Sequence, residues 1–175
     1  VRAESNMIRP YNMFSKISPF DHMQIADVGD VATNAFDLKD SVKRIEATFD
    51  ELLKNPVIPL AIGGDHTMTY PILRSIAKKH GPVGLIHIDA HADINEHMFG
   101  EKIAHGTPFR RAFEDGLLDN KRVAQIGLRA TGYSDDDFDW PREQGWRVVQ
   151  AEECWYKSLT PLMAEVREQM GDGPV

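Results

Sequence analysis

The sequence lacks several features that would assign it to particular classes of protein. A single cysteine, Cys154, excludes an internal disulfide framework and any zinc or iron–sulfur site built from several thiolates. No apolar run approaches the roughly 18 residues that a membrane-spanning helix requires. Basic residues are in deficit, because 20 Lys and Arg face 27 Asp and Glu and leave a net charge of −7. We therefore expect neither a membrane nor a nucleic-acid partner, since nucleic-acid binding needs surplus cationic side chains.

The two ends of the sequence also lack the features of natural chain boundaries. The chain begins at Val1 without a starting methionine or a charged and then apolar leader, and residues 171–175 have the pattern of a turn before a strand. We expect that both ends are cut and that any N-terminal targeting information is missing. A lone cysteine fits a reducing compartment, so we expect a cytoplasmic protein and leave a mitochondrial location open.

Short apolar segments alternate with longer amphipathic ones, which is typical of a parallel α/β sheet. The sequence predicts strands at 25–31, 57–62, 83–89, 123–128 and 146–149. It predicts helices at 38–54, 67–79, 108–114, within 134–144, and at 159–170, and a long polar loop at 90–106. Asp37 is a candidate N-cap for the first of these helices. We expect a single α/β domain over residues 1–175, with an open, doubly wound and mostly parallel sheet.

Potential metal ligands gather directly after two of the expected strands. Gly-Gly-Asp-His at 63–66 follows one strand, and Asp-Ala-His-Ala-Asp at 89–93 ends the next. Residues i, i+2 and i+4 of an extended segment share one face, so the acids and the histidine of the second motif can converge. Carboxylates this close repel each other unless a cation neutralises them. The predicted metal ligands are His66, Asp89, His91 and Asp93. Their oxygen and nitrogen donors favour Mn²⁺, with iron, zinc and nickel left open.

Other chemically active side chains are interpreted from their neighbours. In His-Gly-Thr-Pro at 105–108, glycine and proline fix the backbone where a helix begins, so we expect His105 at the mouth of the site as a proton-transfer residue. His87 lies deeper in its strand, and we favour packing or support of a ligand over metal binding. Cys154 has no evident base partner. We interpret the acids at 135–137 as a solvated helix start rather than a cation site.

The motifs at 63–66, 89–93 and 105–109 (His-Gly-Thr-Pro-Phe) resemble, in this order, the signatures of the ureohydrolases, a family that includes arginase, agmatinase and guanidinobutyrase. The resemblance covers essentially the whole chain and is stronger to the agmatinase and guanidinobutyrase branch. It implies a three-layer α/β/α fold, assembly as trimers or hexamers, and two Mn²⁺ ions at the strand ends. It also implies that His66, Asp89, His91 and Asp93 bind these ions.

The resemblance further implies a reaction. A hydroxide generated by the paired ions attacks the guanidinium carbon of a linear guanidino compound, which gives urea and an amine. His105 would relay a proton to the leaving amine, and Asn95 and Met98 would lie near the far end of the substrate. We favour 4-guanidinobutanoate as this substrate, with agmatine as the alternative.

One part of the family's pattern is not found in these residues. A later Ser-Phe-Asp-x-Asp-x-x-Asp-Pro strand, which carries two further aspartate ligands in the family, is missing. We therefore expect an arginase-like sheet that is incomplete at its C-terminus, and a chain that is inactive alone. Two other hypotheses stay open: a non-catalytic metal-binding fragment of such an enzyme, and another binuclear metallohydrolase of this fold, such as a deacylase.

Overall fold

The computed structural model describes residues 1–129, 132 and 136–175, without the side chain of Asp136. The chain consists of two compact units, Val1–Asp30 and Val31–Val175. The first unit contains two short 3-10 helices, η1 (Glu4–Met7) and η2 (Pro19–Asp21). The Arg2 guanidinium closes this unit by pairing with the carboxylates of Asp27 and Asp30.

The second unit contains the helices and strands that alternate along the rest of the chain. They are α1 (Leu38–Leu52), η3 (His66–Met68), α2 (Thr69–His80), β1 (Val83–Ile88), α3 (Pro108–Glu114), β2 (Leu118–Leu128), α4 (Asp136–Glu143), β3 (Arg147–Gln150), η4 (Ala151–Glu153) and α5 (Thr160–Met170). Asp37 caps α1, because its carboxylate accepts the Asp40 backbone N–H. All five predicted helices are present. No helix among the described residues is both long and apolar enough to cross a membrane.

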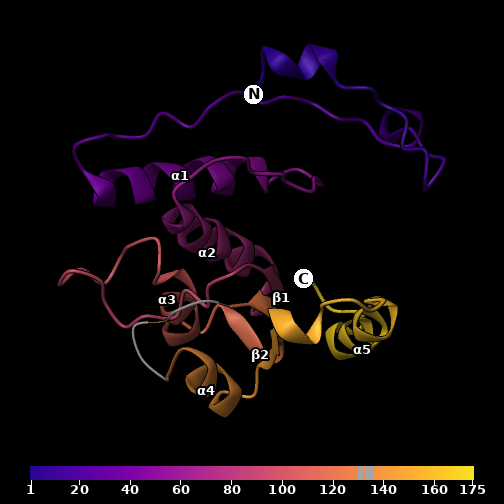
Figure 1. Cartoon of the computed structure of the whole chain (residues 1–175). Coiled ribbons are helices and arrows are strands. Elements are labelled where there is room, and N and C mark those ends of the chain that lie inside the picture. Colours follow the sequence, from indigo (N-terminus) through magenta and orange to yellow (C-terminus); the bar gives the residue numbers. More distant parts are fainter. Residues whose placement is uncertain (130–131, 133–135) are drawn as a thin grey trace. The chain divides into compact units, whose positions relative to one another are not determined.

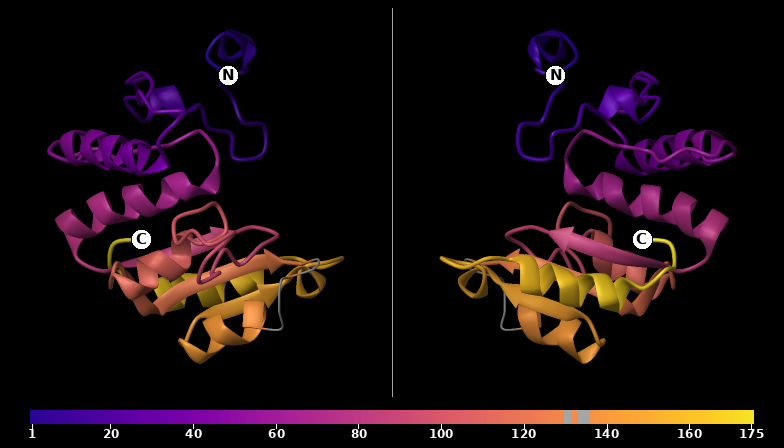
Figure 2. Two further views of the ribbon diagram at one scale, coloured as in Figure 1. Left: turned by 90° about the vertical axis from the view of Figure 1, so that its left-hand side faces the viewer. Right: turned by 90° about the vertical axis from the view of Figure 1, so that its right-hand side faces the viewer.

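The three strands form a parallel sheet in the order β1-β2-β3. Alternate residues of the strands face two separate cores, as the pleat of a strand requires. One core packs the sheet against α2, α3 and α4, and contains Val83, Val123, Val148 and Phe109. The other packs Ala124, Ile126 and Val149 against α5. The structure is thus an α/β/α sandwich, with α3 and α5 on opposite sides of the strands in Figure 1 and α1 outside α2 in Figure 2.

Two of the five predicted strands do not form. Residues 25–31 and 57–62 have no regular secondary structure, and neither pairs with a strand in the described part of the chain. In the second segment the side chains of Ile58 and Leu60 are 98% and 88% exposed. A strand needs a neighbour that accepts and donates backbone hydrogen bonds, which an apolar run cannot provide by itself. β1 is therefore an edge of the described sheet, and Ile88 at its end is 72% exposed.

A cluster of aromatic rings joins α3 to the elements that follow β2. Phe113 at the end of α3 packs edge-on against Trp140 of α4 and Trp146, with ring centroids 5.1 and 6.4 Å apart. The two tryptophans are 5.6 Å apart, and the Arg110 guanidinium lies 4.2 Å above the Trp140 ring. This cluster fixes α3, and hence the loop before it, against the sheet.

Candidate metal centre

The candidate site lies at the carboxyl end of β1, where ligands bind in open α/β sheets. The neighbouring strand β2 extends past this end, and backbone hydrogen bonds join it to the residues that follow β1. The backbone N–H of Asp89 donates to the Ile126 carbonyl at 3.1 Å, and the Arg129 N–H donates to the Ala90 carbonyl at 2.8 Å. Gly127 lies between these bonds with a left-handed φ of +94°, and a Cβ there would lie 3.3 Å from the Asp89 carbonyl oxygen. Glycine at 127 thus lets β2 approach the first acid closely.

The loop from Asp89 to Asp93 turns back instead of continuing as a strand. The Asp89 carboxylate accepts the backbone N–H of His91 at 2.9 Å, which closes a tight local turn. Asp93 has a φ of 51°, and its carbonyl accepts the N–H of Phe109 at 3.2 Å. The expectation that extended backbone brings the motif together was therefore wrong in its geometry. Asp89 and Asp93 converge through this turn, while the His91 side chain remains 66% exposed.

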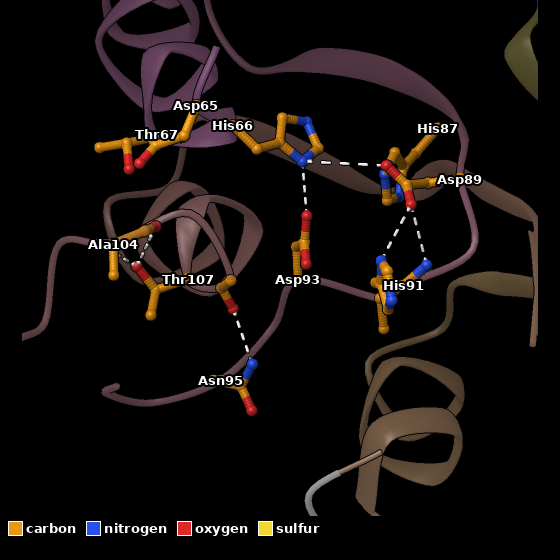
Figure 3. A network of polar contacts seen from close by, with 12 residues as sticks. Asp65, His66, Thr67, His87, Asp89, His91, Asp93, Asn95, Ala104 and Thr107 are labelled. Carbon is orange, nitrogen blue, oxygen red and sulfur yellow. Dashed lines mark hydrogen bonds and ion pairs between the residues drawn. The ribbon is translucent and has the colours of Figure 1, made fainter. Parts of the chain in front are cut away.

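Four side chains bring their potential ligand atoms within 4.8 Å of one another: His66, His87, Asp89 and Asp93. Nδ1 of His66 lies 2.5 Å from Asp93 Oδ2 and 4.0 Å from Asp89 Oδ2. Nε2 of His87 lies 3.5 Å from the same Asp89 oxygen. Figure 3 shows one nitrogen of the His66 imidazole directed at both carboxylates. The cluster therefore joins one residue from the Gly-Gly-Asp-His motif to the β1 end.

Position 66 is fixed by a helix start. The Asp65 carboxylate accepts the Thr67 backbone N–H at 3.0 Å and caps η3, which continues directly into α2. The Thr67 side chain is buried, and the His66 ring packs edge-on against Phe109 at 5.4 Å. The imidazole is thus held by helix capping and by contact with α3.

The electrostatics of the cluster favour a cation. The hydrogen bond to Asp93 raises the pKa of His66 above its usual value, although burial acts in the opposite direction. Burial acts to raise the pKa of Asp89, but the His91 N–H and the imidazoles of His87 and His66 together lower it. Burial lowers the pKa of His87 to about 4, so this ring is neutral near pH 7. The two carboxylates thus favour a positive charge between them.

A divalent metal fits this arrangement. His66 Nδ1 faces the two carboxylates, as a ligand atom would face a shared ion, and a metal bound there would compete with the proton that this nitrogen can accept. Two carboxylates and an imidazole supply the oxygen and nitrogen donors of a site for a hard or borderline cation. The described residues contain this one cluster of at least three potential ligands.

The four predicted ligands do not all lie in the cluster, and His87, which was not predicted as a ligand, does. His66, Asp89 and Asp93 lie together as expected. His91 stays outside the group, with Nδ1 3.5 Å from Asp89 Oδ1, and its role as a ligand remains a prediction. His87 is inside the group, although the sequence favoured a packing or supporting role for it.

The residues predicted to act on the substrate line one cavity beside the cluster. This cavity of about 330 Å³ is bounded in part by His91, Asp93, Asn95, Met98 and His105. His105 is exposed at its mouth, where the sequence places it. The roles of Asn95, Met98 and His105 are not tested by these positions and remain predictions.

The loop segments around the cavity are tied to each other. The backbone and side-chain amides of Asn95 both donate to the Gly106 carbonyl, each at 3.0 Å. The Thr107 hydroxyl and backbone bond to Ala104 and close a turn around His105. A Cβ on Gly106 would lie 2.5 Å from Met98 Sδ, so a larger residue at this position would displace the Met98 side chain. His105 is therefore held by its neighbours rather than by its own side chain.

Two further positions qualify the sequence interpretation. Gln125 of β2 is fully buried. It is not among the predicted functional residues, although a polar residue inside an apolar strand was the available signal. Of the acids at 135–137, Asp135 and the side chain of Asp136 lie outside the described residues, and α4 begins at Asp136.

The fold and the site define an α/β/α protein with a candidate metal centre of carboxylates and imidazoles at the end of a parallel strand. The sequence pattern of the arginase family matches residues 1–175, so the chain belongs to the arginase family. The expectation of an arginase-like fold is confirmed by the structure of proclavaminate amidino hydrolase from Streptomyces clavuligerus, which matches with a TM-score of 0.91. That match has 34% identity and covers 99% of this chain and 58% of the other.

Relatives of known name agree with the branch that the motifs indicated. The chain is 65% identical over 175 residues to guanidinobutyrase of Pseudomonas aeruginosa and 54% identical to the mitochondrial agmatinase of Gallus gallus. These matches cover 100% of this chain but 55% and 52% of the two relatives. The chain thus spans about half the length of the curated relatives it matches.

Proposed function

We propose that the protein hydrolyses a linear guanidino compound to urea and the corresponding amine, with Mn²⁺ bound at the end of β1. The observation that carries this proposal is the convergence of His66, Asp89 and Asp93 beside a cavity that also contains His105. Relatives named guanidinobutyrase and agmatinase support the reaction class.

The chain's own residues would hold the metal and set its charge. His66, Asp89 and Asp93 would supply ligand atoms, and the exposed His91, with Nδ1 3.5 Å from Asp89 Oδ1, would supply a further imidazole. Bound divalent ions supply a hydroxide nucleophile near neutral pH and orient it. The turn at Asp89 and the bond from Phe109 to the Asp93 carbonyl keep the two carboxylates in place before any ion binds.

His105 is the proposed proton-transfer residue. It stands at the cavity mouth in the turn closed by Ala104 and Thr107, and no other side chain bonds it in the described structure. An exposed imidazole can pass a proton between the leaving amine and water. Asn95 positions it by fixing the Gly106 carbonyl next along the chain.

For the substrate we propose 4-guanidinobutanoate, with agmatine as the alternative. The guanidinobutyrase relative at 65% identity supports the first choice, and the agmatinase relative at 54% supports the second. The two compounds differ in carrying a carboxylate or an ammonium group at the far end. A side-by-side urea assay with both compounds at equal concentration decides between them.

We also propose that the protein assembles as a homotrimer or hexamer and works in the cytoplasm, with a mitochondrial location as the alternative. Both proposals follow from membership of the family and from relatives that include bacterial and mitochondrial proteins. Light scattering of the purified protein and microscopy of a tagged form test them.

The decisive experiment separates metal binding from catalysis. In the complete protein, of which residues 1–175 are expected to be an inactive part, we expect His105→Ala to retain bound Mn²⁺ and to slow urea release by about 10²–10⁴-fold, the usual contribution of acid–base catalysis. His97→Ala is the matched control, because His97 is exposed in the same loop but does not line the cavity. Loss of metal from His105→Ala, or urea release by His105→Ala as fast as by His97→Ala, would overturn the proton-transfer role of His105. A wild-type protein that binds Mn²⁺ without releasing urea would favour a non-catalytic metal-binding role, and release of a carboxylate from an acylated amine would favour a deacylase.

A further inference from the structure

Gln125, His87 and Asp89 form a line of polar side chains from the interior of the sheet to the metal centre. Gln125 of β2 and His87 of β1 are register partners, and they are 0% and 6% exposed. Burial of two polar side chains in an apolar core is costly unless they are paired, so their arrangement needs a reason.

The hydrogen bonds of Gln125 fix the orientation of its amide. Nε2 lies 2.8 Å from the Ala92 carbonyl oxygen and 3.1 Å from His87 Nδ1. A carbonyl oxygen can only accept, so the NH₂ group and not the amide oxygen must face Ala92. Reversing the amide would bring two oxygens together. The second N–H of the amide is therefore available to His87 Nδ1, which must accept it.

This donor determines the state of the His87 ring. A neutral imidazole carries its proton on one nitrogen and accepts at the other, so an accepting Nδ1 places the proton on Nε2. Nε2 is buried, has no hydrogen-bond partner among the described residues, and lies 3.5 Å from Asp89 Oδ2. The ring packs 4.3 Å from Phe109, which restricts its rotation.

We propose that Gln125 holds His87 as the Nε2–H tautomer, so that His87 directs its N–H at Asp89 and orients this carboxylate instead of binding metal. A nitrogen that carries a proton has no lone pair for an ion, so His87 is excluded as a ligand through Nε2 even though it lies in the cluster of four. The same amide, through Ala92, also fixes the loop between His91 and Asp93. The role toward the metal rests on the function proposed above, whereas the tautomer does not.

This arrangement explains why a glutamine lies in an otherwise apolar strand. Residues that orient metal ligands typically contribute about 10–100-fold to metal affinity or activity. Here Asp89 has one oxygen held by the His91 N–H and the other faced by His87 and His66. His87 is thus a positioning residue, and Gln125 acts through it.

The first test measures the tautomer in the metal-free protein. Nitrogen-15 NMR of protein labelled in its histidine rings distinguishes a protonated from an unprotonated ring nitrogen, and His87→Phe assigns the His87 signals. We expect Nε2 to be protonated and Nδ1 to be unprotonated near pH 7. A protonated Nδ1 would overturn the proposal, and this measurement requires neither a Gln125 variant nor metal.

The second test measures the effect on the metal site with Mn²⁺ as the probe. We expect Gln125→Met to weaken Mn²⁺ binding by about 10–100-fold with the number of ions at saturation unchanged. Adding His87→Phe to this variant should weaken binding no further than His87→Phe alone. Gln169→Met is the matched control, because the Gln169 amide also donates to two backbone carbonyls but lies far along α5.

The outcomes separate this proposal from the proposed function. If His87→Phe removes bound ions in the way that His66→Ala does, His87 is a ligand and the proposal is wrong. If the wild-type protein binds Mn²⁺ but releases no urea, the proposed function fails while the tautomer and the binding results still stand.

Discussion

Two short apolar runs end in candidate metal ligands, yet only one of them is a strand. β1 pairs with β2 and ends at Ile88, directly before Asp89. Residues 57–62 are as apolar and lead into the Gly-Gly-Asp-His motif, but they form no strand and are mostly exposed. The difference teaches that an apolar run becomes a strand only where a neighbour supplies hydrogen bonds, whereas ligand placement depends on the turn or cap that follows the run.

His66 illustrates the second half of this lesson. Although the run before it is unpaired, its imidazole lies within the cluster because the capped helix start and Phe109 hold it. The site is therefore built by two different means, a strand end on one side and a helix start on the other. The predictions below test each side.

The largest effect is expected where the two sides meet. Asp93→Asn should abolish retention of Mn²⁺, because it removes the carboxylate charge that binds His66 and would bind the ion. Asparagine tolerates the left-handed backbone at this position better than alanine, so the backbone is preserved. Metal content after gel filtration measures the loss.

Asp139→Asn is the control for Asp93→Asn, since Asp139 is an exposed acid that pairs with Arg142 on α4. It should retain metal like the wild type. Retention of metal by Asp93→Asn would show that Asp89 and the histidines suffice.

The next effect contrasts paired and unpaired runs directly. Leu128→Ala at the end of β2 should lower the free energy of unfolding by about 2–5 kcal/mol, because a fully buried side chain leaves a cavity. Leu60→Ala should change it by less than about 0.5 kcal/mol, because this side chain is exposed. Urea titration followed by circular dichroism measures both. A large effect at Leu60 would mean that the 57–62 segment is covered in solution.

A smaller effect is expected at the close approach of β2 to Asp89. Gly127→Ala and Gly145→Ala both place a Cβ on left-handed backbone, and each should cost about 1–3 kcal/mol of stability. Only Gly127→Ala also crowds a ligand residue, since its Cβ would lie 3.3 Å from the Asp89 carbonyl oxygen. Calorimetric Mn²⁺ titration should therefore show weaker binding for Gly127→Ala alone. Equal affinities would contradict the role given to this contact.

The smallest effect concerns α2, which follows His66. The Tyr70 hydroxyl donates to the Asp115 carboxylate at 2.6 Å, and burial together with this carboxylate raises the pKa of Tyr70 from 10.0 to about 12. Tyr70→Phe should cost about 1 kcal/mol near neutral pH. A folded-state pKa above the unfolded value gives stability that is complete below pH 10 and is lost as the pH rises through 12.

The stability difference between wild type and Tyr70→Phe should therefore be constant below pH 10 and shrink above it. Paired urea titrations over this range measure the difference, and titration of lysines cancels because both proteins contain them. A gap that widens with alkaline pH would contradict the assigned bond.

The helices were predictable because their apolar spacing and caps are local. Asp37 and Pro108 each lie at the helix start that the sequence indicates. The strand predicted at 57–62 does not form, because pairing depends on which segments are neighbours and an apolar run does not reveal this. Asp89 and Asp93 lie in one cluster, but they meet through a turn and a left-handed residue that spacing does not reveal.

Gln125 shows a different limit of prediction. Its side chain acts across two strands, and the register that opposes it to His87 becomes visible only in the folded sheet. His91 shows the converse, since a motif position alone does not say which way a loop side chain points.

The aromatic cluster at the end of α3 places two tryptophans where their fluorescence depends on the position of α3. Trp140 and Trp146 pack against Phe113, and α3 begins three residues after His105 in the cavity wall. Tryptophan emission depends on the packing and polarity around the ring, so an adjustment of this loop that shifts α3 changes the emission. Where ligand binding in the cavity shifts α3, intrinsic fluorescence reports occupancy of the cavity. The half-exposed Trp155 adds emission of its own to this signal.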